Sequence, residues 1–120
     1  MPCPFCDHSH SFLESSLSVA RFDNYPVSPG HTLVTTKRHV SSYFDATSDE
    51  VSDLWKLVGE VKQHLDLKHQ PTSYNVGINI GLDAGQTVMH VHVHVIPRYT
   101  GDMEDPSGGV RGVIPNRQKY

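Results

Sequence analysis

The stretch that decides the fold is His90-Val91-His92-Val93-His94-Val95-Ile96, in which histidine and valine alternate. Alternate residues of a β-strand share one face, so we expect a strand over about 89–97 with its valines on one face and its histidines on the other. The valine face is typical of a packed core. Three imidazoles seldom fill a hydrophobic interior, so the histidine face predicts a chemical role.

The three histidines are spaced too widely along a strand to share one metal ion. Same-face neighbours lie about 6.6 Å apart, which separates the outer pair by about 13 Å, whereas metal–nitrogen bonds measure only about 2.0–2.1 Å. At least one outer histidine must therefore have another task. Imidazole titrates near neutral pH and is a competent nucleophile, so proton transfer or nucleophilic attack fits the others. A metalloenzyme in which two of the three hold a catalytic ion is an alternative.

The remaining segments predict an α+β domain built on an antiparallel meander. Apolar residues within 11–23 indicate one or two strands, and a proline-rich turn over 25–30 leads into another strand over 31–36. Residues 74–80 alternate apolar side chains with asparagine and glycine, which predicts a strand with one packed face. Glycines on its other face leave room for a close approach.

One long helix is predicted between these strands. Thr47 and Glu50 have the spacing of a capping box, and apolar residues then recur at three- and four-residue steps. We expect a helix over about 48–67 whose apolar stripe consists of Val51, Leu54, Trp55, Val58, Val61 and Leu65.

Length and composition indicate a single globular domain over residues 1–120. The sequence is 37% hydrophobic, enough for a modest core, and its net charge of −3 favours neither a nucleic-acid-binding nor a membrane-binding surface. It contains no apolar run near the ~18 residues of a membrane span and no signal-peptide pattern, so a cytoplasmic protein is expected. Residues 1–10 predict a knuckle. The glycine- and proline-rich residues 99–120 predict a C-terminal arm without a core of its own.

The pair Cys3-Pro4-Phe5-Cys6 admits three interpretations: a redox pair, half of a zinc site, or two ordinary thiols. A thioredoxin-like redox pair should follow a strand and open a helix, and no strand fits before residue 3. Half a zinc site needs two further ligands, which the nine histidines could supply. A strand-end histidine together with a histidine from elsewhere would complete it, and His8 and His10 are rival ligands.

With its lead-in Gly85-Gln86-Thr87-Val88-Met89, the alternating strand resembles the signature of the histidine triad (HIT) family, His-φ-His-φ-His-φ-φ, where φ is hydrophobic. Residues 23–34 and the following Lys37-Arg38-His39 are similar to the family's strand–turn–strand region, so the resemblance covers roughly 3–98. It implies a HIT-like fold, with a five-stranded antiparallel sheet and one long helix packed on it. It also implies a homodimer in which the two sheets join.

The resemblance implies cleavage at the α-phosphate of a purine nucleoside phosphoramidate or a dinucleoside polyphosphate, by hydrolysis or nucleotidyl transfer. The reaction would pass through a covalent nucleotidyl-histidine. By position, His92 is the nucleophile, His94 lines the phosphate, and His31 lies near the leaving group. Substrate-binding positions are matched by Asp23 for the ribose, Asn79 in the same pocket, and Gln86 and Thr87 for the phosphate. A nucleotide-binding sensor or adaptor with little turnover is the alternative.

The resemblance also implies a structural zinc. Several bacterial and archaeal relatives, and the related galactose-1-phosphate uridylyltransferases, hold this ion between an N-terminal CxxC and two histidines. By position, its ligands here are Cys3, Cys6, His39 and His90. Four ligands without an open position form a structural site, which would help to stabilise so small a core. The alternative is that both cysteines are free thiols.

Overall fold

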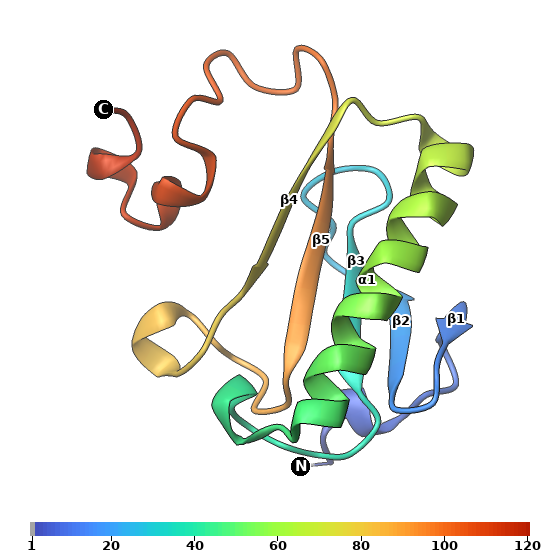
Figure 1. The fold of residues 1–120 in the computed structure, drawn as a ribbon. Coiled ribbons are helices and arrows are strands. Elements are labelled where there is room, and N and C mark those ends of the chain that lie inside the picture. Colours follow the sequence, from blue (N-terminus) through green and yellow to red (C-terminus); the bar gives the residue numbers. More distant parts are fainter. Residues whose placement is uncertain (1) are drawn as a thin grey trace.

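The computed structural model describes residues 2–120 and contains a five-stranded antiparallel sheet crossed by one long helix (Figure 1). The strands are β1 (Leu13–Glu14), β2 (Ser18–Phe22), β3 (Thr32–Thr36), β4 (Ser73–Ile78) and β5 (His92–Arg98). They lie in the order β1-β2-β3-β5-β4, and every neighbouring pair is antiparallel. The predicted α+β architecture is confirmed, but the predicted meander is wrong, because β5, the last strand in sequence, lies between β3 and β4.

Helix α1 (Ser48–His69) begins at the predicted capping box. The Thr47 side chain accepts a hydrogen bond from the Glu50 amide at 3.1 Å, and Glu50 accepts one from the Thr47 amide at 2.9 Å. The helix runs two residues beyond the predicted end at 67. It stops at Gln70, which adopts a left-handed conformation with φ of 53°, immediately before Pro71, a residue that disfavours helix in its predecessor.

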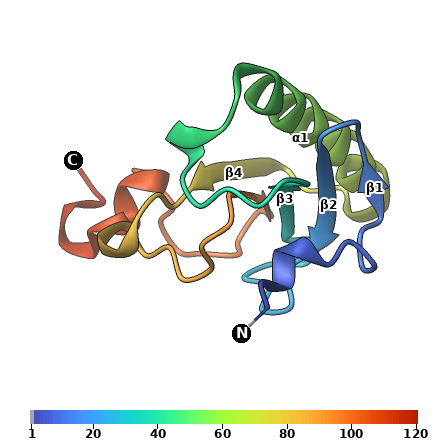
Figure 2. The ribbon, with the colours of Figure 1, turned by 90° about the horizontal axis from the view of Figure 1, so that it is seen from below.

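The core lies between α1 and one face of the sheet, and the N-terminal segment lies on the other side (Figure 2). The helix buries Leu54, Leu57, Val61 and Leu65 against the three valines Val91, Val93 and Val95. This confirms the predicted valine face.

The predicted stripe on the helix is partly wrong. Leu57, which was not in it, is 1% exposed, whereas Trp55 is 40% exposed. The Trp55 ring N–H donates to the Tyr43 hydroxyl at 3.2 Å, and such a polar contact at the ring edge suits a boundary position better than the core.

Two strands are shorter than predicted. Strand β5 begins at His92 rather than near 89, where its pairing with β3 begins opposite Thr35. The Val91 amide instead donates to the Val40 carbonyl in the loop after β3 at 2.8 Å. His90 therefore lies just before the strand. At the other edge, β4 ends at Ile78, and Asn79 lies in the loop that follows.

Residues 99–120 form an arm of turns and short 3-10 helices beyond the β4 edge of the sheet (Figure 1). These helices are η4 (Gly109–Val113) and η5 (Pro115–Arg117). The arm is held together by its own contacts, such as the Arg111 guanidinium donating to the carbonyls of Arg117 and Gln118. None of the helices within residues 2–120 combines the length and apolar character needed to cross a membrane.

Candidate active site and metal centre

The histidine face of β5 lies opposite the helix and receives residues from both neighbouring strands. In the sheet register, His94 lies opposite Leu33 of β3 on one side and Gly77 of β4 on the other. His31 immediately precedes β3, and Asp23 immediately follows β2. Because β5 lies between β3 and β4, residues that are far apart in sequence lie close together on this face. The largest separation is 71 positions, from Asp23 to His94.

His92 is buried, with 7% of its surface exposed, and one of its ring nitrogens is fixed. Its Nδ1 lies 2.8 Å from the His90 carbonyl oxygen. Because a carbonyl can only accept, Nδ1 carries the proton and Nε2 keeps its lone pair. The Phe5 ring meets the His92 ring edge-on with centroids 4.9 Å apart. In the neutral ring this contact leaves the lone pair on Nε2, oriented as a nucleophile requires.

His31 and His94 form a hydrogen-bonded pair whose protons can be assigned from their neighbours. The Val27 amide donates to Nδ1 of His31 at 3.1 Å, so the proton of this ring is on Nε2. That Nε2 lies 3.0 Å from Nδ1 of His94 and donates to it. His94 must then carry its own proton on Nε2. A neutral His94 consequently offers a hydrogen-bond donor on the histidine face.

Burial keeps this pair neutral. Desolvation is the main cause that lowers the pKa of His94 to about 4, with smaller contributions in the same direction from the nearby His92 and His31 rings. Burial also lowers the pKa of His31, while the Asp23 carboxylate opposes that change. Both imidazoles are therefore uncharged near neutral pH, where each has one donor and one acceptor nitrogen.

Asp23, His31 and His94 bring three potential metal-binding atoms within 4.8 Å of one another. One Asp23 oxygen accepts from the Tyr25 amide at 2.8 Å, and the other lies 3.4 Å from Nε2 of His31. Because His31 Nε2 carries a proton in this network, it has no lone pair for an ion. The three side chains therefore form a hydrogen-bonded network centred on His31.

Two hollows meet at His94, and both have volumes typical of ligand pockets. The knuckle-side pocket, about 460 Å³, is lined by residues that include Phe5, Arg21, Phe22, Asp23, Thr87 and His92. The arm-side pocket, about 450 Å³, is lined by residues that include Val27, His31, Gly77, Ile96, Val110 and Val113. His94 and Asn79 line both pockets. The site therefore has two lobes, with His94 at their junction.

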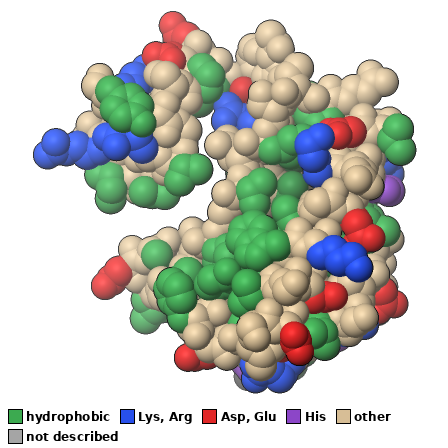
Figure 3. Space-filling model, viewed as in Figure 1, with side chains coloured by type: hydrophobic (Ala, Val, Ile, Leu, Met, Phe, Trp, Pro, Cys, Tyr) green, Lys and Arg blue, Asp and Glu red, His purple; other side chains and the backbone are tan. Residues whose placement is uncertain are grey.

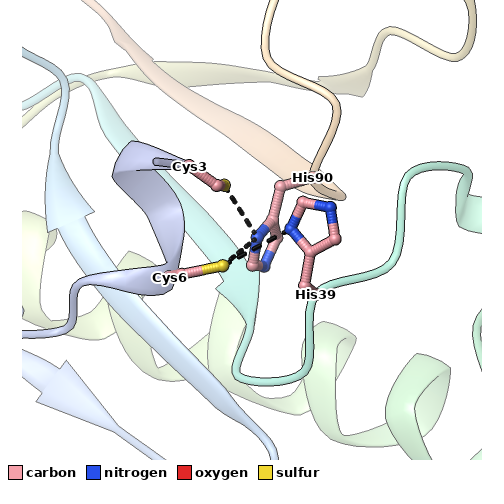
Figure 4. Close-up of side chains that lie close together, drawn as sticks. All are labelled: Cys3, Cys6, His39 and His90. Atoms are coloured by element: carbon pink, nitrogen blue, oxygen red, sulfur yellow. Dashed lines mark hydrogen bonds between the residues drawn. The ribbon is translucent and has the colours of Figure 1, made fainter. Parts of the chain in front are cut away.

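Cys3, Cys6, His39 and His90 converge on one point (Figure 4). Nδ1 of His90 lies 3.3 Å from Cys3 Sγ and 3.6 Å from Cys6 Sγ, and Nδ1 of His39 lies 3.4 Å from Cys6 Sγ. Tetrahedral zinc with bonds of about 2.3 Å to sulfur and 2.0–2.1 Å to nitrogen places those atoms about 3.5 Å apart. The observed separations fit that geometry.

The protonation of His90 also suits a metal ligand. Its Nε2 lies 2.7 Å from the Thr36 carbonyl oxygen and therefore carries the proton, which leaves the Nδ1 lone pair directed at the two sulfurs. A carbonyl that fixes the outer nitrogen is the usual support for a metal-bound histidine. The rival ligands His8 and His10 are not among the four converging residues.

The two residues predicted to bind the phosphate, Gln86 and Thr87, lie in different surroundings in the structure. The Gln86 amide group is buried and donates to the carbonyls of Ser41 and Val88, while its oxygen accepts from the Gly81 amide. Both donors are used to brace the loop, so the side chain has no N–H left for a phosphate. Thr87 is exposed and lines the knuckle-side pocket.

Arg21 and Phe5 line this pocket and were missed in the sequence. Arg21 is 8% exposed, donates to the Pro4 and Asp7 carbonyls, and lies 5.2 Å from the centre of the Phe5 ring. It clamps the knuckle onto the sheet and presents Phe5 to the pocket. The available signal was spacing, because Arg21 stands two residues before Asp23 and shares its face.

The sequence model of the HIT domain matches residues 7–101. The chain is 41% identical over 98 residues to the bifunctional bis(5'-adenosyl)-triphosphatase/adenylylsulfatase FHIT of Arabidopsis thaliana, covering 82% of this chain and 54% of that protein. It is 41% identical over 97 residues to the asymmetrical bis(5'-nucleosyl)-tetraphosphatase of Schizosaccharomyces pombe, covering 81% and 53%. The chain thus spans about half the length of these curated relatives.

A solved structure extends the comparison to the fold. The crystal structure of a HIT family protein from Bacillus anthracis superposes with a TM-score of 0.77 at 32% identity, and the match covers 83% of this chain and 75% of that one.

Proposed function

Because the chain belongs to the HIT family, we propose that it is a nucleotide hydrolase or nucleotidyl transferase in which His92 attacks the α-phosphorus. The observation that carries this proposal is the fixed His92 ring, whose Nδ1–H is held by the His90 carbonyl. Two relatives support the substrate class, since they are named as hydrolases of bis(5'-nucleosyl) polyphosphates.

The proposed reaction proceeds in two displacements. Nε2 of His92 forms a bond to the α-phosphorus, and the bond from phosphorus to the leaving group breaks. The leaving group departs with the bonding electrons and takes up one proton from solvent, to which the attacking water or acceptor later gives one proton back. A water molecule, or another acceptor in a transfer, then breaks the phosphorus–nitrogen bond, releases the nucleoside monophosphate and returns the proton.

Neighbouring residues have distinct roles in this proposal. The Nε2–H of neutral His94 donates to the phosphate as charge develops on its oxygens, and His31 is a positioning residue that fixes the His94 proton. Asp23 and Phe5 line the knuckle-side pocket, which would take the nucleoside. Thr87 adds a hydroxyl donor at the same pocket.

We extend the proposal to a structural zinc held by Cys3, Cys6, His39 and His90, supported by the fit of their separations to tetrahedral geometry. The bound ion would cross-link the N-terminal segment to the loops beside β3 and β5. The ion would also hold Phe5 in place at the candidate site, because Phe5 lies between the two cysteines in sequence and packs against His92.

We also propose the homodimer. Strand β4 is an edge strand of the sheet, and the edge of a sheet is a template for another strand. Val76 on β4 and Trp55 on α1 are among the exposed apolar side chains, 36% and 40% exposed respectively. Sedimentation velocity of the wild type and of Val76→Lys tests this proposal: the wild type should sediment at twice the chain mass and the variant as a monomer.

The decisive experiment traps the covalent intermediate. Wild type and His92→Ala are mixed with an α-³²P-labelled adenosine phosphoramidate, quenched within milliseconds and analysed by intact mass and acid lability. His64→Ala, on α1, is the matched control for loss of an imidazole. We expect an acid-labile nucleotidyl adduct in the wild type and control only, and a loss of turnover of at least about 10³-fold in His92→Ala. Tight nucleotide binding without adduct or turnover would instead support the sensor or adaptor.

A further inference from the structure

Arg21 is a buried cation without a carboxylate partner among residues 2–120. Only 8% of its surface is exposed, and no carboxylate oxygen of the described residues lies within 4.0 Å of its nitrogens. Other cations of the chain lie 2.6 to 3.1 Å from an acidic oxygen, namely Lys37, Arg38, Lys62, Arg98 and Lys119. Figure 3 shows lysine and arginine side chains, in blue, at the surface of the α1 side of the molecule. Buried charges are normally paired, so Arg21 is an exception that requires a reason.

Backbone carbonyls use only part of the donor capacity of Arg21. Its Nη1 donates to the Pro4 carbonyl at 3.2 Å, and its Nη2 donates to the Asp7 carbonyl. Its Nε is buried and has no acceptor in the described part of the chain. These two contacts leave three of the five N–H groups of the guanidinium without an acceptor there. The carbonyls hold the knuckle in place, but they do not neutralise the charge.

The sheet register places Arg21 on the same face as the reacting histidines. Arg21 lies opposite Leu33 of β3, and Leu33 lies opposite His94 of β5. Directly opposed residues share a face. Neighbouring strands are about 4.8 Å apart, so the Cα atoms of Arg21 and His94 are separated by about 10 Å. Asp23, the proposed contact of the ribose, follows Arg21 by two residues. Arg21 therefore borders the volume between these groups.

Arg21 is the only lysine or arginine among the described residues that line the knuckle-side pocket. With the phosphate at His92 and the ribose at Asp23, the base of a nucleotide would occupy the remaining part of this pocket, whose lining includes Phe5 and Arg21. The guanidinium carbon of Arg21 lies 5.2 Å from the centre of the Phe5 ring. Both side chains therefore border the same part of the pocket, one with an aromatic surface and the other with hydrogen-bond donors.

Guanine is the purine whose edge suits such donors. Its O6 and N7 atoms are two adjacent acceptors that match the paired N–H groups of an arginine. Adenine presents N7 beside the N6 amino group, which is itself a donor. A buried N–H that faces another donor loses its hydrogen bond, and this loss costs free energy. An arginine in the wall of the pocket therefore favours guanine over adenine.

We propose that Arg21 determines the nucleobase preference of this chain: its guanidinium donates to O6 and N7 of guanine, so that the knuckle-side pocket favours guanine nucleotides over adenine nucleotides. The inference rests on the proposed function, which places the phosphate at His92 and the ribose at Asp23. The bound base supplies acceptors that residues 2–120 do not supply to this arginine. Arg21 selects the base, while bond formation at phosphorus stays with His92.

The first test compares the 5'-phosphoramidates of guanosine, inosine and adenosine, which share one leaving group. For the wild type, we expect kcat/KM to be about 5- to 100-fold higher for guanosine than for adenosine. Inosine keeps O6 and N7 but lacks the N2 amino group, so it should lie within about threefold of guanosine. A wild type that uses adenosine as well as guanosine, or better, would overturn the proposal.

Arg21→Met and Arg21→Lys separate base selection from the structural role of this side chain. We expect the ratio of kcat/KM for guanosine to that for adenosine to fall to within about twofold of unity in Arg21→Met. Arg21→Lys keeps a cationic donor and should retain an intermediate ratio. Arg117→Met, at an exposed arginine of the arm, is the matched control and should keep the wild-type ratio. If Arg21→Met slows both substrates equally and leaves the ratio unchanged, Arg21 is only a structural clamp and the proposal is wrong.

A binding measurement on the wild type tests the proposal without any variant and without turnover. Calorimetry gives the Kd of GMP, 7-deaza-GMP and AMP. Because 7-deaza-GMP lacks the N7 acceptor, we expect it to bind at least about fivefold more weakly than GMP, and AMP to bind more weakly still. If no phosphoramidate turns over, the proposed function fails, and these three Kd values decide the role of Arg21 by themselves. Equal affinities for the three nucleotides would refute it.

Discussion

Glu50→Gln should destabilise the fold in a pH-dependent way. Glu50 is 4% exposed and lies at the start of α1, where its two oxygens accept from the Arg38 guanidinium at 2.8 and 3.0 Å. Glutamine keeps the shape and can still complete the capping box with Thr47. The substitution therefore removes the charge of a buried carboxylate while leaving the local structure in place.

The magnitude follows from the pKa of this carboxyl group. Hydrogen bonding to Arg38 is the largest influence on it, and the pKa falls from 4.5 to about 2. One pKa unit corresponds to about 1.36 kcal/mol, so the charged form contributes roughly 3 kcal/mol to the free energy of unfolding. Because the folded pKa lies below the unfolded value, this contribution is complete above pH 4.5 and is lost as the pH falls towards 2.

Urea denaturation of wild type and Glu50→Gln at pH 7 and pH 3 measures the effect. We expect the variant to be less stable by roughly 3 kcal/mol at pH 7 and by about half as much at pH 3. Asp49→Asn, which alters the neighbouring helical position, controls for a general loss of helix charge. A stability difference that is the same at both pH values would refute the reasoning, since it would show that the cost arises from packing rather than ionisation.

Three other outcomes are expected. In a ¹⁵N NMR titration, the His94 ring should stay neutral at pH 6 and protonate with a midpoint of about 4. Because the folded pKa of His94 lies below the unfolded value of 6.5, the free energy of unfolding should fall as the pH drops from 6.5 towards 4. An NMR midpoint near 6.5 would contradict the assigned network. Gln86→Ala should lower the free energy of unfolding by about 2–4 kcal/mol, because it removes three partly buried hydrogen bonds of the loop, and hydrogen exchange should accelerate at Gly81. Untagged wild type should hold about one equivalent of zinc by mass spectrometry, and Cys6→Ser should lose the metal and unfold at a lower temperature. A Cys6→Ser protein with unchanged metal content and melting temperature would exclude this ligand set.

Local patterns were sufficient to predict the main elements. Strict alternation over 90–96 assigned the strand and its two faces, and the spacing of Thr47 and Glu50 located the start of α1. These signals are local because a strand or a helix turn is defined by neighbours a few residues apart. The strand ends were less accurate, since they depend on the partners that the folded chain supplies: the Val91 amide donates to the Val40 carbonyl in a loop, outside the β3–β5 ladder.

In the candidate site, too, the sequence predicted the residues and the fold determined their contacts. The resemblance of the motif selected His92 and the four zinc ligands by position, and the structure brings those ligands together. The resemblance did not reveal that both N–H groups and the oxygen of the Gln86 side chain are hydrogen-bonded to backbone groups. That outcome depends on carbonyls of Ser41 and Val88, and the Ser41 contact spans 45 residues of sequence. Hydrogen-bond partners of this kind exist only once the chain is folded.

The sequence by itself determined which residues carry chemistry and which face of their strand they occupy, because side-chain type and strand periodicity are written into adjacent positions. Only the tertiary structure decided what each histidine does with its two nitrogens. The carbonyls of Thr36 and His90 and the amide of Val27 set those protons, and none of them is identifiable from residue type. The two lobes around His94 are likewise a tertiary result, because β5 lies between strands from distant parts of the chain and the arm closes one lobe from outside the sheet.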